Sequence, residues 1–249
     1  SKFLKHVECP YCGSSDAGAI YDDGHFHCFA CGKTVHDEHQ LDHEAAHINY
    51  WKAMSTLPDK VPGQVQPITD RGISRQTCEK YGVTIDGNKH YYPYTDESGS
   101  TVAYKVRNTE NKSFGIKGEF TKARLFGQNL FHSGGKYVTI TEGELDALAA
   151  YQMAGSQWPF VSIRNGAQAA LKDCKAQFEW LNSFETIVVC FDADEPGRKA
   201  AKEVAELFGS KAKIVKHLAG YKDACDYLVA GAGKEFVNEW WRAEVFIPD

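Results

Sequence analysis

The sequence predicts an α/β protein with a small β-rich module, a flexible linker, a small α+β lobe and a final domain built on a parallel sheet flanked by helices. Two observations support this fold class. Two closely spaced cysteine pairs lie near the N-terminus, and two acidic clusters later in the chain each follow a short β-branched run. In open α/β sheets, such runs are buried strands whose carboxyl ends carry the functional side chains.

The composition bounds the class of protein. With 249 residues, 43% apolar and 24% charged, the chain can bury a substantial core and has room for one large domain and a small module. No apolar stretch approaches the length of about 18 residues that a membrane span needs, and the first residues lack the apolar region of a signal peptide. We therefore expect a soluble, intracellular protein whose cysteines are reduced.

Four of the eight cysteines form two C-x-x-C pairs, Cys9 with Cys12 and Cys28 with Cys31, separated by fifteen residues. Two thiolates at this spacing can meet one tetrahedral ion, so the pattern predicts one structural zinc ion. Two disulfides or a redox motif are the alternatives, but no βαβ context surrounds either pair. His25 and His27 flank the third cysteine, and we expect neither to be a ligand because four thiolates are available.

Two short strand-like runs between the cysteine pairs are joined by an Asp-Gly turn, which is a hairpin signal. The module is therefore predicted to be a zinc ribbon over residues 1–50. Its aromatic and imidazole side chains suit stacking on unpaired bases or hydrogen bonding to them. Alternatively, Tyr21, Phe26 and Phe29 form the small core around the zinc ion.

A change of character marks residues 51–67, which are predicted to be a linker because they contain Pro58, Pro62, Gly63 and Pro67. Before it, residues 38–54 show a rough helical pattern. Four histidines also fall in this region. We expect them to form a solvated polar face, since no cysteine supports a second metal site; they are His36, His39, His43 and His47.

Residues 68–135 are predicted to be a separate α+β lobe, with a short helix near residues 74–78 and two strands, 90–94 and 102–107, joined by a turn. Residues 101–136, nearly all of them in this lobe, are basic although the whole chain has a formal charge of −5. The excess favours a polyanionic ligand, nucleic acid or triphosphate, although a solvated surface would explain most lysines singly. The basic residues are Lys105, Arg107, Lys112, Lys117, Lys122, Arg124 and Lys136.

Residues 136–249 alternate between strand and helix patterns as βαβ units do, which predicts a parallel sheet. The expected strands end near residues 141, 163, 192 and 218. The expected helices cover 145–153, 167–180 and 196–207.

The acidic clusters follow the first and third of these strands. Glu142 and Glu144 follow one, and Asp192 and Asp194 follow the other. Neighbouring carboxylates repel one another unless they are protonated or bridged by a cation, so the pattern indicates a divalent metal site. Asp194 could instead cap the helix that begins near Pro196, but capping leaves the other carboxylates unexplained.

Three acidic segments of residues 136–249 together resemble the TOPRIM domain of bacterial-type primases, topoisomerases and some nucleases. They are Glu142 within residues 141–146, the Asp192-x-Asp194 pair, and residues 222–226. The full order of zinc ribbon, linker, basic lobe and TOPRIM domain is similar to the primase half of T7-type phage primase-helicases. This resemblance covers nearly the whole chain and implies synthesis of short RNA primers on single-stranded DNA from ribonucleoside triphosphates, which is nucleotidyl transfer.

The resemblance also implies site residues. Glu142, Asp192 and Asp194 would hold Mg²⁺ or Mn²⁺ as catalytic ligands. Lys105 and Lys112 would contact nucleotide phosphates during catalysis. Further substrate contacts would come from Arg107 in the basic lobe and, toward template bases, from Asp23 and His25 in the ribbon.

The implied partners are a replicative helicase in the same full-length polypeptide and a replicative DNA polymerase, with no membrane and a location in the host cytoplasm. No nucleoside-triphosphatase motor is encoded in these residues, so we expect a fragment of a longer protein; a free-standing primase is the alternative. Two other functions use similar parts. A TOPRIM nuclease would use the same carboxylates, and a non-catalytic recombination-repair clamp also combines zinc with TOPRIM. The basic lobe favours nucleotide polymerisation over both.

Overall fold

The computed structural model describes residues 1–35, apart from 8, 10, 11, 13, 15, 16 and 24, together with residues 57, 58 and 60–247. The helical pattern expected over 38–54, with its four histidines, lies outside the described residues. The chain divides into two compact units, one of residues 1–63 and 85–123 and one of residues 64–84 and 124–249. Residues 68–84 and 124–135, expected in the basic lobe, therefore group with the parallel sheet.

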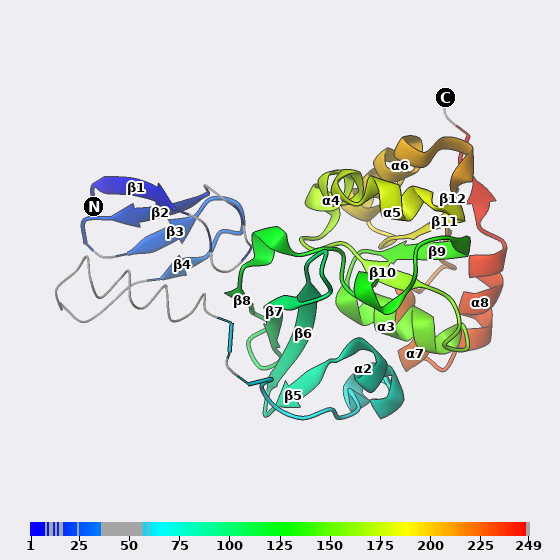
Figure 1. Ribbon diagram of the computed structural model, residues 1–249, viewed down its shortest axis with the longest axis horizontal. Coiled ribbons are helices and arrows are strands. Elements are labelled where there is room, and N and C mark those ends of the chain that lie inside the picture. The colour runs from blue at the N-terminus through cyan, green and yellow to red at the C-terminus, as the bar shows by residue number, and fades with distance from the viewer. Residues whose placement is uncertain are drawn as a thin grey trace. The chain divides into compact units, whose positions relative to one another are not determined.

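The N-terminal module is a four-stranded antiparallel sheet in chain order (Figure 1). Its strands are β1 (Phe3–Val7), β2 (Gly18–Tyr21), β3 (Phe26–Cys28) and β4 (Thr34–Val35). The predicted hairpin is present, with Ala19 opposite His27 in the β2–β3 pair. Phe26 is buried with Cys9 and Cys28, whereas Phe29 is 63% exposed. Phe26 therefore supplies the core of the module, and Phe29 lies at its surface.

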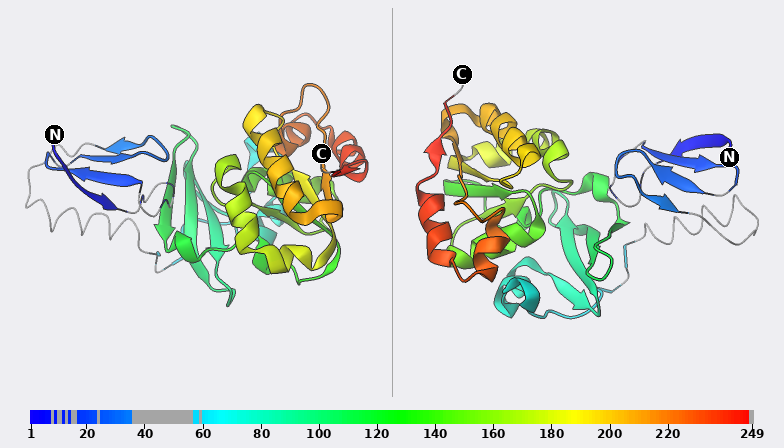
Figure 2. Two further views of the ribbon diagram at one scale, coloured as in Figure 1. Left: turned by 90° about the horizontal axis from the view of Figure 1, so that it is seen from above. Right: turned by 180° about the vertical axis from the view of Figure 1, so that it is seen from behind.

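A second antiparallel sheet lies in the order β5-β6-β7-β8 and forms one twisted layer (Figure 2). Its strands are β5 (Thr84–Asp86), β6 (Lys89–Thr95), β7 (Thr101–Asn108) and β8 (Phe114–Gly118). The strands expected over 90–94 and 102–107 correspond to β6 and β7. Asp96 shapes the turn between them, because its Oδ1 accepts hydrogen bonds from the backbone N–H groups of Ser98 and Ser100.

The second unit contains a five-stranded sheet in the order β10-β9-β11-β12-β13. The strands β9 (Gly135–Thr141), β10 (Phe160–Ser162), β11 (Phe184–Cys190) and β12 (Ala212–Ile214) are parallel, and β13 (Glu244–Val245) is antiparallel at the edge. Thr141 pairs with both Ser162 and Cys190, so three strands end at the same level. The parallel sheet predicted from the β-branched runs is confirmed.

Helices cover both faces of this sheet, as Figure 1 shows. On one face lie α4 (Ala170–Ala176), α5 (Phe178–Asn182) and α6 (Glu195–Phe208). Alternate strand residues such as Ile140 and Val189 form the core beneath them. On the other face lie α3 (Glu144–Met153), α7 (Ala224–Val229) and α8 (Gly233–Trp241). Among the described residues, no helix is long and apolar enough to cross a membrane.

The helix predicted over 167–180 is interrupted at Gln177, which has φ −115° and ψ 24°. Its side-chain Oε1 accepts hydrogen bonds from Arg124 Nε at 3.3 Å and Gln128 Nε2 at 2.9 Å. These tertiary contacts accompany the break between α4 and α5. Short 3-10 helices also occur. Within the described part of the chain, one lies in the first unit, at Phe120–Lys122, and four lie in the second, at Thr69–Arg71, Gln128–Leu130, Ala167–Ala169 and Gly209–Lys211.

Helix α2 (Arg75–Tyr81) packs in the second unit although the sequence suggested the basic lobe. Ser74 caps its N-terminus by accepting a hydrogen bond from Thr77 N–H. The buried Tyr81 hydroxyl donates to the Phe160 carbonyl at 2.8 Å, and the Ser74 N–H donates to Gln152. These bonds reach residues nearly eighty positions away, so local sequence patterns do not reveal them.

Candidate functional site

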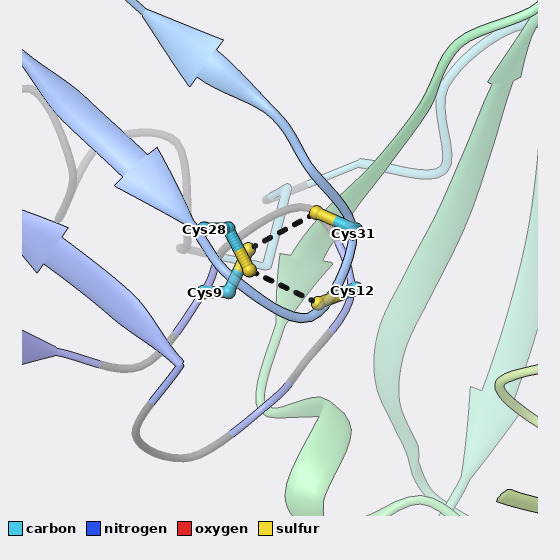
Figure 3. A group of neighbouring side chains, drawn as sticks. All are labelled: Cys9, Cys12, Cys28 and Cys31. Atoms are coloured by element: carbon cyan, nitrogen blue, oxygen red, sulfur yellow. Dashed lines mark hydrogen bonds between the residues drawn. The ribbon is translucent and has the colours of Figure 1, made fainter. Parts of the chain in front are cut away.

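The four N-terminal cysteines converge on one point (Figure 3). Their sulfur atoms all lie within 4.8 Å of one another, with Cys9 Sγ 3.8 Å from Cys31 Sγ and Cys12 Sγ 3.7 Å from Cys28 Sγ. Sulfurs bound at about 2.3 Å around a tetrahedral zinc ion would be about 3.8 Å apart. The four thiol groups therefore fit one zinc ion.

Asp23 and His25 lie together in the hairpin turn of this module. His25 Nδ1 contacts Asp23 Oδ1 at 2.5 Å, and its ring stacks on Tyr21 with 4.1 Å between centroids and a 9° interplanar angle. The Asp23 side chain is 52% exposed. His27 Nδ1 contacts Thr34 Oγ1 instead. The Asp23–His25 pair is thus a partly exposed hydrogen-bonding group whose two side chains contact each other.

A second group of ligand-type side chains lies at the carboxyl edge of the parallel sheet. Asp146, Asp192 and Asp223 each offer a carboxylate oxygen, and these oxygens lie within 4.8 Å of one another. In an octahedral Mg²⁺ site, ligand oxygens are about 3 Å apart when adjacent and about 4.2 Å apart when opposite. The three carboxylates therefore fit a divalent cation with small side-chain adjustments.

Glu142 follows β9 and lies beside this group. Its Oε1 accepts a hydrogen bond from Ala167 N–H at 3.3 Å, but its buried Oε2 has no hydrogen-bond partner among the described residues. Burial and the neighbouring Asp192 raise the pKa of Glu142. A buried carboxylate oxygen without a partner is costly, and a bound cation would satisfy it.

Lys222 bridges the two carboxylates that follow β11. Its Nζ lies 2.9 Å from Asp192 Oδ2 and 3.3 Å from Asp194 Oδ2, and the Asp192 contact raises the pKa of Lys222. Asp194 also caps α6, because its Oδ1 accepts from Gly197 N–H at 2.9 Å; this bond is the main reason that the pKa of Asp194 is lowered. Capping thus occupies Oδ1 of Asp194, and Oδ2 faces the Lys222 ammonium group.

Sequence reasoning did not select Asp146 and Asp223 as ligands. Asp146 lies in the first turn of α3, and burial and the neighbouring Asp223 raise its pKa well above the usual value. Asp223 caps α7 by accepting from Asp226 N–H, and burial raises its pKa as well. One signal was available for Asp146: it lies in the first helical turn after the strand end that carries Glu142, and the carboxyl ends of parallel strands are where functional side chains gather.

Two glycines let the backbone approach the acidic group closely. A Cβ on Gly143 would lie 2.8 Å from Asp146 Oδ2, and a Cβ on Gly197 would lie 2.3 Å from the Asp192 carbonyl oxygen. Both separations are shorter than ordinary van der Waals contacts. Glycine at position 197 therefore allows the start of α6 to approach the Asp192 backbone, whereas at position 143 the contact is with the Asp146 side chain in the same turn.

The loop that supplies Ala167 N–H to Glu142 is fixed by a buried ion pair. Asp173 is 1% exposed, and it accepts hydrogen bonds from Arg164 Nε at 3.0 Å, from the second guanidinium nitrogen at 2.7 Å and from Arg164 N–H at 2.8 Å. The guanidinium donates to Oδ1 and the Arg164 backbone N–H to Oδ2, and such charge-assisted contacts hold a loop in one geometry. The pair therefore orients the segment that contacts Glu142.

Replacing Asp173 with asparagine should destabilise the second unit, because the largely buried Arg164 loses the charged carboxylate that accepts three of its hydrogen bonds. We expect a loss of about 2–4 kcal/mol in the free energy of unfolding. Chemical denaturation of the full chain measures it. A loss below about 0.5 kcal/mol would show that the pair does not hold the loop.

The matched substitution Asp146→Asn should raise the free energy of unfolding, whereas Asp173→Asn should lower it. Because the folded-state pKa of Asp146 is raised, the native state binds more protons than the unfolded chain above about pH 4, and its stability falls as pH rises. Asparagine keeps an oxygen that can accept from Cys225 N–H but removes the repelling charge.

In Mg²⁺- and Mn²⁺-free buffer at pH 7, we expect Asp146→Asn to raise Tm by about 2–4 °C. Added Mn²⁺ should stabilise the wild type more than this variant, because a ligand of the native state shifts unfolding by mass action. Thermal unfolding with and without Mn²⁺ measures both effects. A lower Tm for the variant in metal-free buffer would contradict the repulsion argument.

The predicted phosphate-contacting residues lie in the first unit. Lys105 and Arg107 are half-buried on β7, and Lys112 is exposed in the turn before β8 with φ 55°. Asn111 shapes that turn by accepting from Ser113 N–H at 3.0 Å. The carboxylates lie in the second unit, so the basic and acidic parts of the predicted site belong to separate units.

Comparison with known proteins gives the family. The family model described as "Bacteriophage T7 DNA helicase/primase, N-terminal a+b fold" matches residues 63–118, and a Toprim-like model matches residues 139–228. The crystal structure of the primase fragment of the bacteriophage T7 primase-helicase protein is 32% identical, covers 95% of this chain and 99% of that one, and has a TM-score of 0.64. The chain belongs to the T7-type primase family.

Two further relatives extend the comparison within the T7-type primase family. The DNA helicase/primase of Enterobacteria phage T3 is 34% identical over 259 residues, which are all of this chain and 45% of that protein. This chain thus spans less than half of that relative. The second relative is a chain in a structure of the bacteriophage T7 lagging-strand DNA polymerase interacting with primase domains bound to an RNA/DNA hybrid and dTTP. That chain is 34% identical, the match covers 74% of this chain and 94% of that chain, and the TM-score is 0.65.

Proposed function

We propose that the chain makes short RNA primers on single-stranded DNA by joining ribonucleoside triphosphates. The observation that carries this proposal is the convergence of Asp146, Asp192 and Asp223 at the carboxyl edge of the parallel sheet, in a member of the T7-type primase family. Phosphoryl transfer needs positioned positive charge more than covalent help from the protein. Three carboxylates that fit a divalent cation would place that positive charge at the reacting phosphates.

Asp146, Asp192 and Asp223 would hold Mg²⁺ or Mn²⁺, with Glu142 and Asp194 beside them. When bound, the cation supplies polarisation of the attacking 3′-hydroxyl and neutralisation of the triphosphate. The carboxylates themselves fix the position of that charge, since they project from paired strand ends and capped helix starts.

The basic lobe would bind the triphosphate. Lys105 and Lys112 offer ammonium groups, and Arg107 offers a planar guanidinium suited to bidentate phosphate contacts. Phosphate contacts carry no base identity, so these three residues would serve all four nucleotides alike.

The zinc ribbon would read the template. Asp23 offers carboxylate oxygens as acceptors and His25 a ring nitrogen, and their mutual contact fixes their geometry. Such groups can hydrogen-bond the exposed edges of unpaired bases. The zinc ion would be structural, because so small a module has little core apart from Phe26 and its thiols.

The same carboxylates could serve a nuclease, and the same domain pair could serve a DNA-binding clamp. The basic β7 strand and the family relationship favour a primase over both. By analogy with the relatives named above, the partners would be a helicase within the same polypeptide and a replicative DNA polymerase, acting in the host cytoplasm.

Substitutions in the acidic group test the proposed chemistry. Asp192→Ala or Glu142→Ala should reduce RNA product by at least about a hundredfold with little loss of fold, because Asp192 would be a cation ligand and Glu142 adds a carboxylate beside the cation, each at a paired strand end. Asp194→Asn should be nearly as damaging if Asp194 contacts the cation, but mild if it only caps α6, since asparagine caps as well as aspartate. Primer synthesis from labelled nucleotides and Mg²⁺ is the measurement; wild-type yield from Asp192→Ala would exclude the assigned role.

Template reading should be separable from the chemistry. A fragment lacking residues 1–56 should still extend a supplied primer in a metal-dependent reaction but should not initiate at a preferred template signal. His25→Ala in the full chain should shift or weaken template preference with less effect on extension. Product mapping on a panel of single-stranded templates measures both, and unchanged initiation by the truncated fragment would leave the ribbon with a structural role alone.

A further inference from the structure

One exposed aromatic side chain lies among the basic residues and has no role in the scheme above. Phe114 begins β8, the edge strand of its sheet, and 43% of it is exposed. It pairs with Arg107 across the β7–β8 ladder, and Lys105 pairs with Ile116 two positions further along. Because cross-strand partners and alternate residues share a face, Lys105, Arg107 and Phe114 lie on one face of the sheet.

Both cations lie over the Phe114 ring. Lys105 Nζ is 5.4 Å from the ring centroid, and Arg107 Cζ is 5.8 Å from it. These distances approach the outer limit of about 6 Å for a cation–π contact, so each contact is weak at this exposed position. A flat ring beside two cationic side chains is the combination that proteins use to hold single-stranded nucleic acid.

We propose that Phe114 is a stacking platform for the base of a nucleotide whose phosphates are held by Lys105 and Arg107. This inference rests on the proposed function and adds a base-binding residue to it. Stacking tolerates any base, because every base has a π-face, so Phe114 contributes affinity without selecting sequence. The base belongs either to the DNA template or to a ribonucleoside triphosphate, and binding probes can distinguish these sources.

The competing explanation is that Phe114 only covers the aliphatic stems of Lys105 and Arg107. Isoleucine at position 114 would preserve an apolar, strand-favouring side chain but remove the ring, whereas tyrosine would preserve the ring. Phe178→Leu is a matched control in the second unit, because Phe178 is another exposed aromatic residue, at 36%, outside the basic lobe.

The experiment measures binding by the full chain with Mg²⁺ to three probes: fluorescein-labelled oligo(dT), ATP, and inorganic tripolyphosphate, which has no base. Phe114→Ile should weaken oligo(dT) or ATP about five- to tenfold and leave tripolyphosphate unchanged. Loss with oligo(dT) assigns the template base, and loss with ATP assigns the nucleotide base. Phe114→Tyr and Phe178→Leu should match the wild type.

Unchanged binding of all probes by Phe114→Ile would overturn the inference. So would an equal loss for tripolyphosphate, or a Phe114→Tyr variant as weak as Phe114→Ile, since either result makes the residue a support for the basic side chains. RNA synthesis by the wild type is measured in parallel. A wild type that makes no RNA but shows ring-dependent binding refutes the proposed function alone, and an active wild type with ring-independent binding refutes this inference alone.

Discussion

The electrostatic repulsion among carboxylates at one edge of the parallel sheet is the constraint on which the rest of the second unit depends. Because Thr141 on β9 pairs with Cys190 on β11, the residues that follow, Glu142 and Asp192, emerge within one residue of the same level. Burial raises the pKa of Glu142 and, more strongly, that of Asp146. Paired strands cannot move apart to relieve this repulsion, so protonation of a carboxylate or nearby positive charge offsets it. Lys222 supplies part of that charge, and a divalent cation would supply the remainder.

The surrounding structure maintains this unfavourable arrangement. Gly143 and Gly197 permit close backbone approach, the Arg164–Asp173 pair fixes the loop beside Glu142, and helix caps orient Asp194 and Asp223. Each of these contacts is favourable in itself. Repulsion among the carboxylates is thereby offset by the favourable hydrogen bonds of the surrounding residues. Functional sites commonly keep such locally unfavourable features at a cost in stability.

Short stretches of sequence predicted those features that depend on residues close together in the chain. The cysteine spacing indicated the zinc module, and the β-branched runs indicated β9 and β11 with acidic residues at their ends. The missed features depend on tertiary contacts. Asp223 approaches Asp146 only because α7 packs on α3, the break at Gln177 accompanies bonds to Gln128, and α2 joins the second unit through Tyr81. None of these contacts has a signature within a short window of sequence.

The central claim is that the edge carboxylates form a divalent-cation site. Anomalous X-ray diffraction from crystals of the chain soaked in Mn²⁺ tests it most directly, because the signal locates the ion without reference to activity. We expect an anomalous peak within about 2.5 Å of carboxylate oxygens from at least two of Asp146, Asp192 and Asp223. A fully soaked crystal without a peak at that position, or with Mn²⁺ bound only elsewhere, would contradict the account.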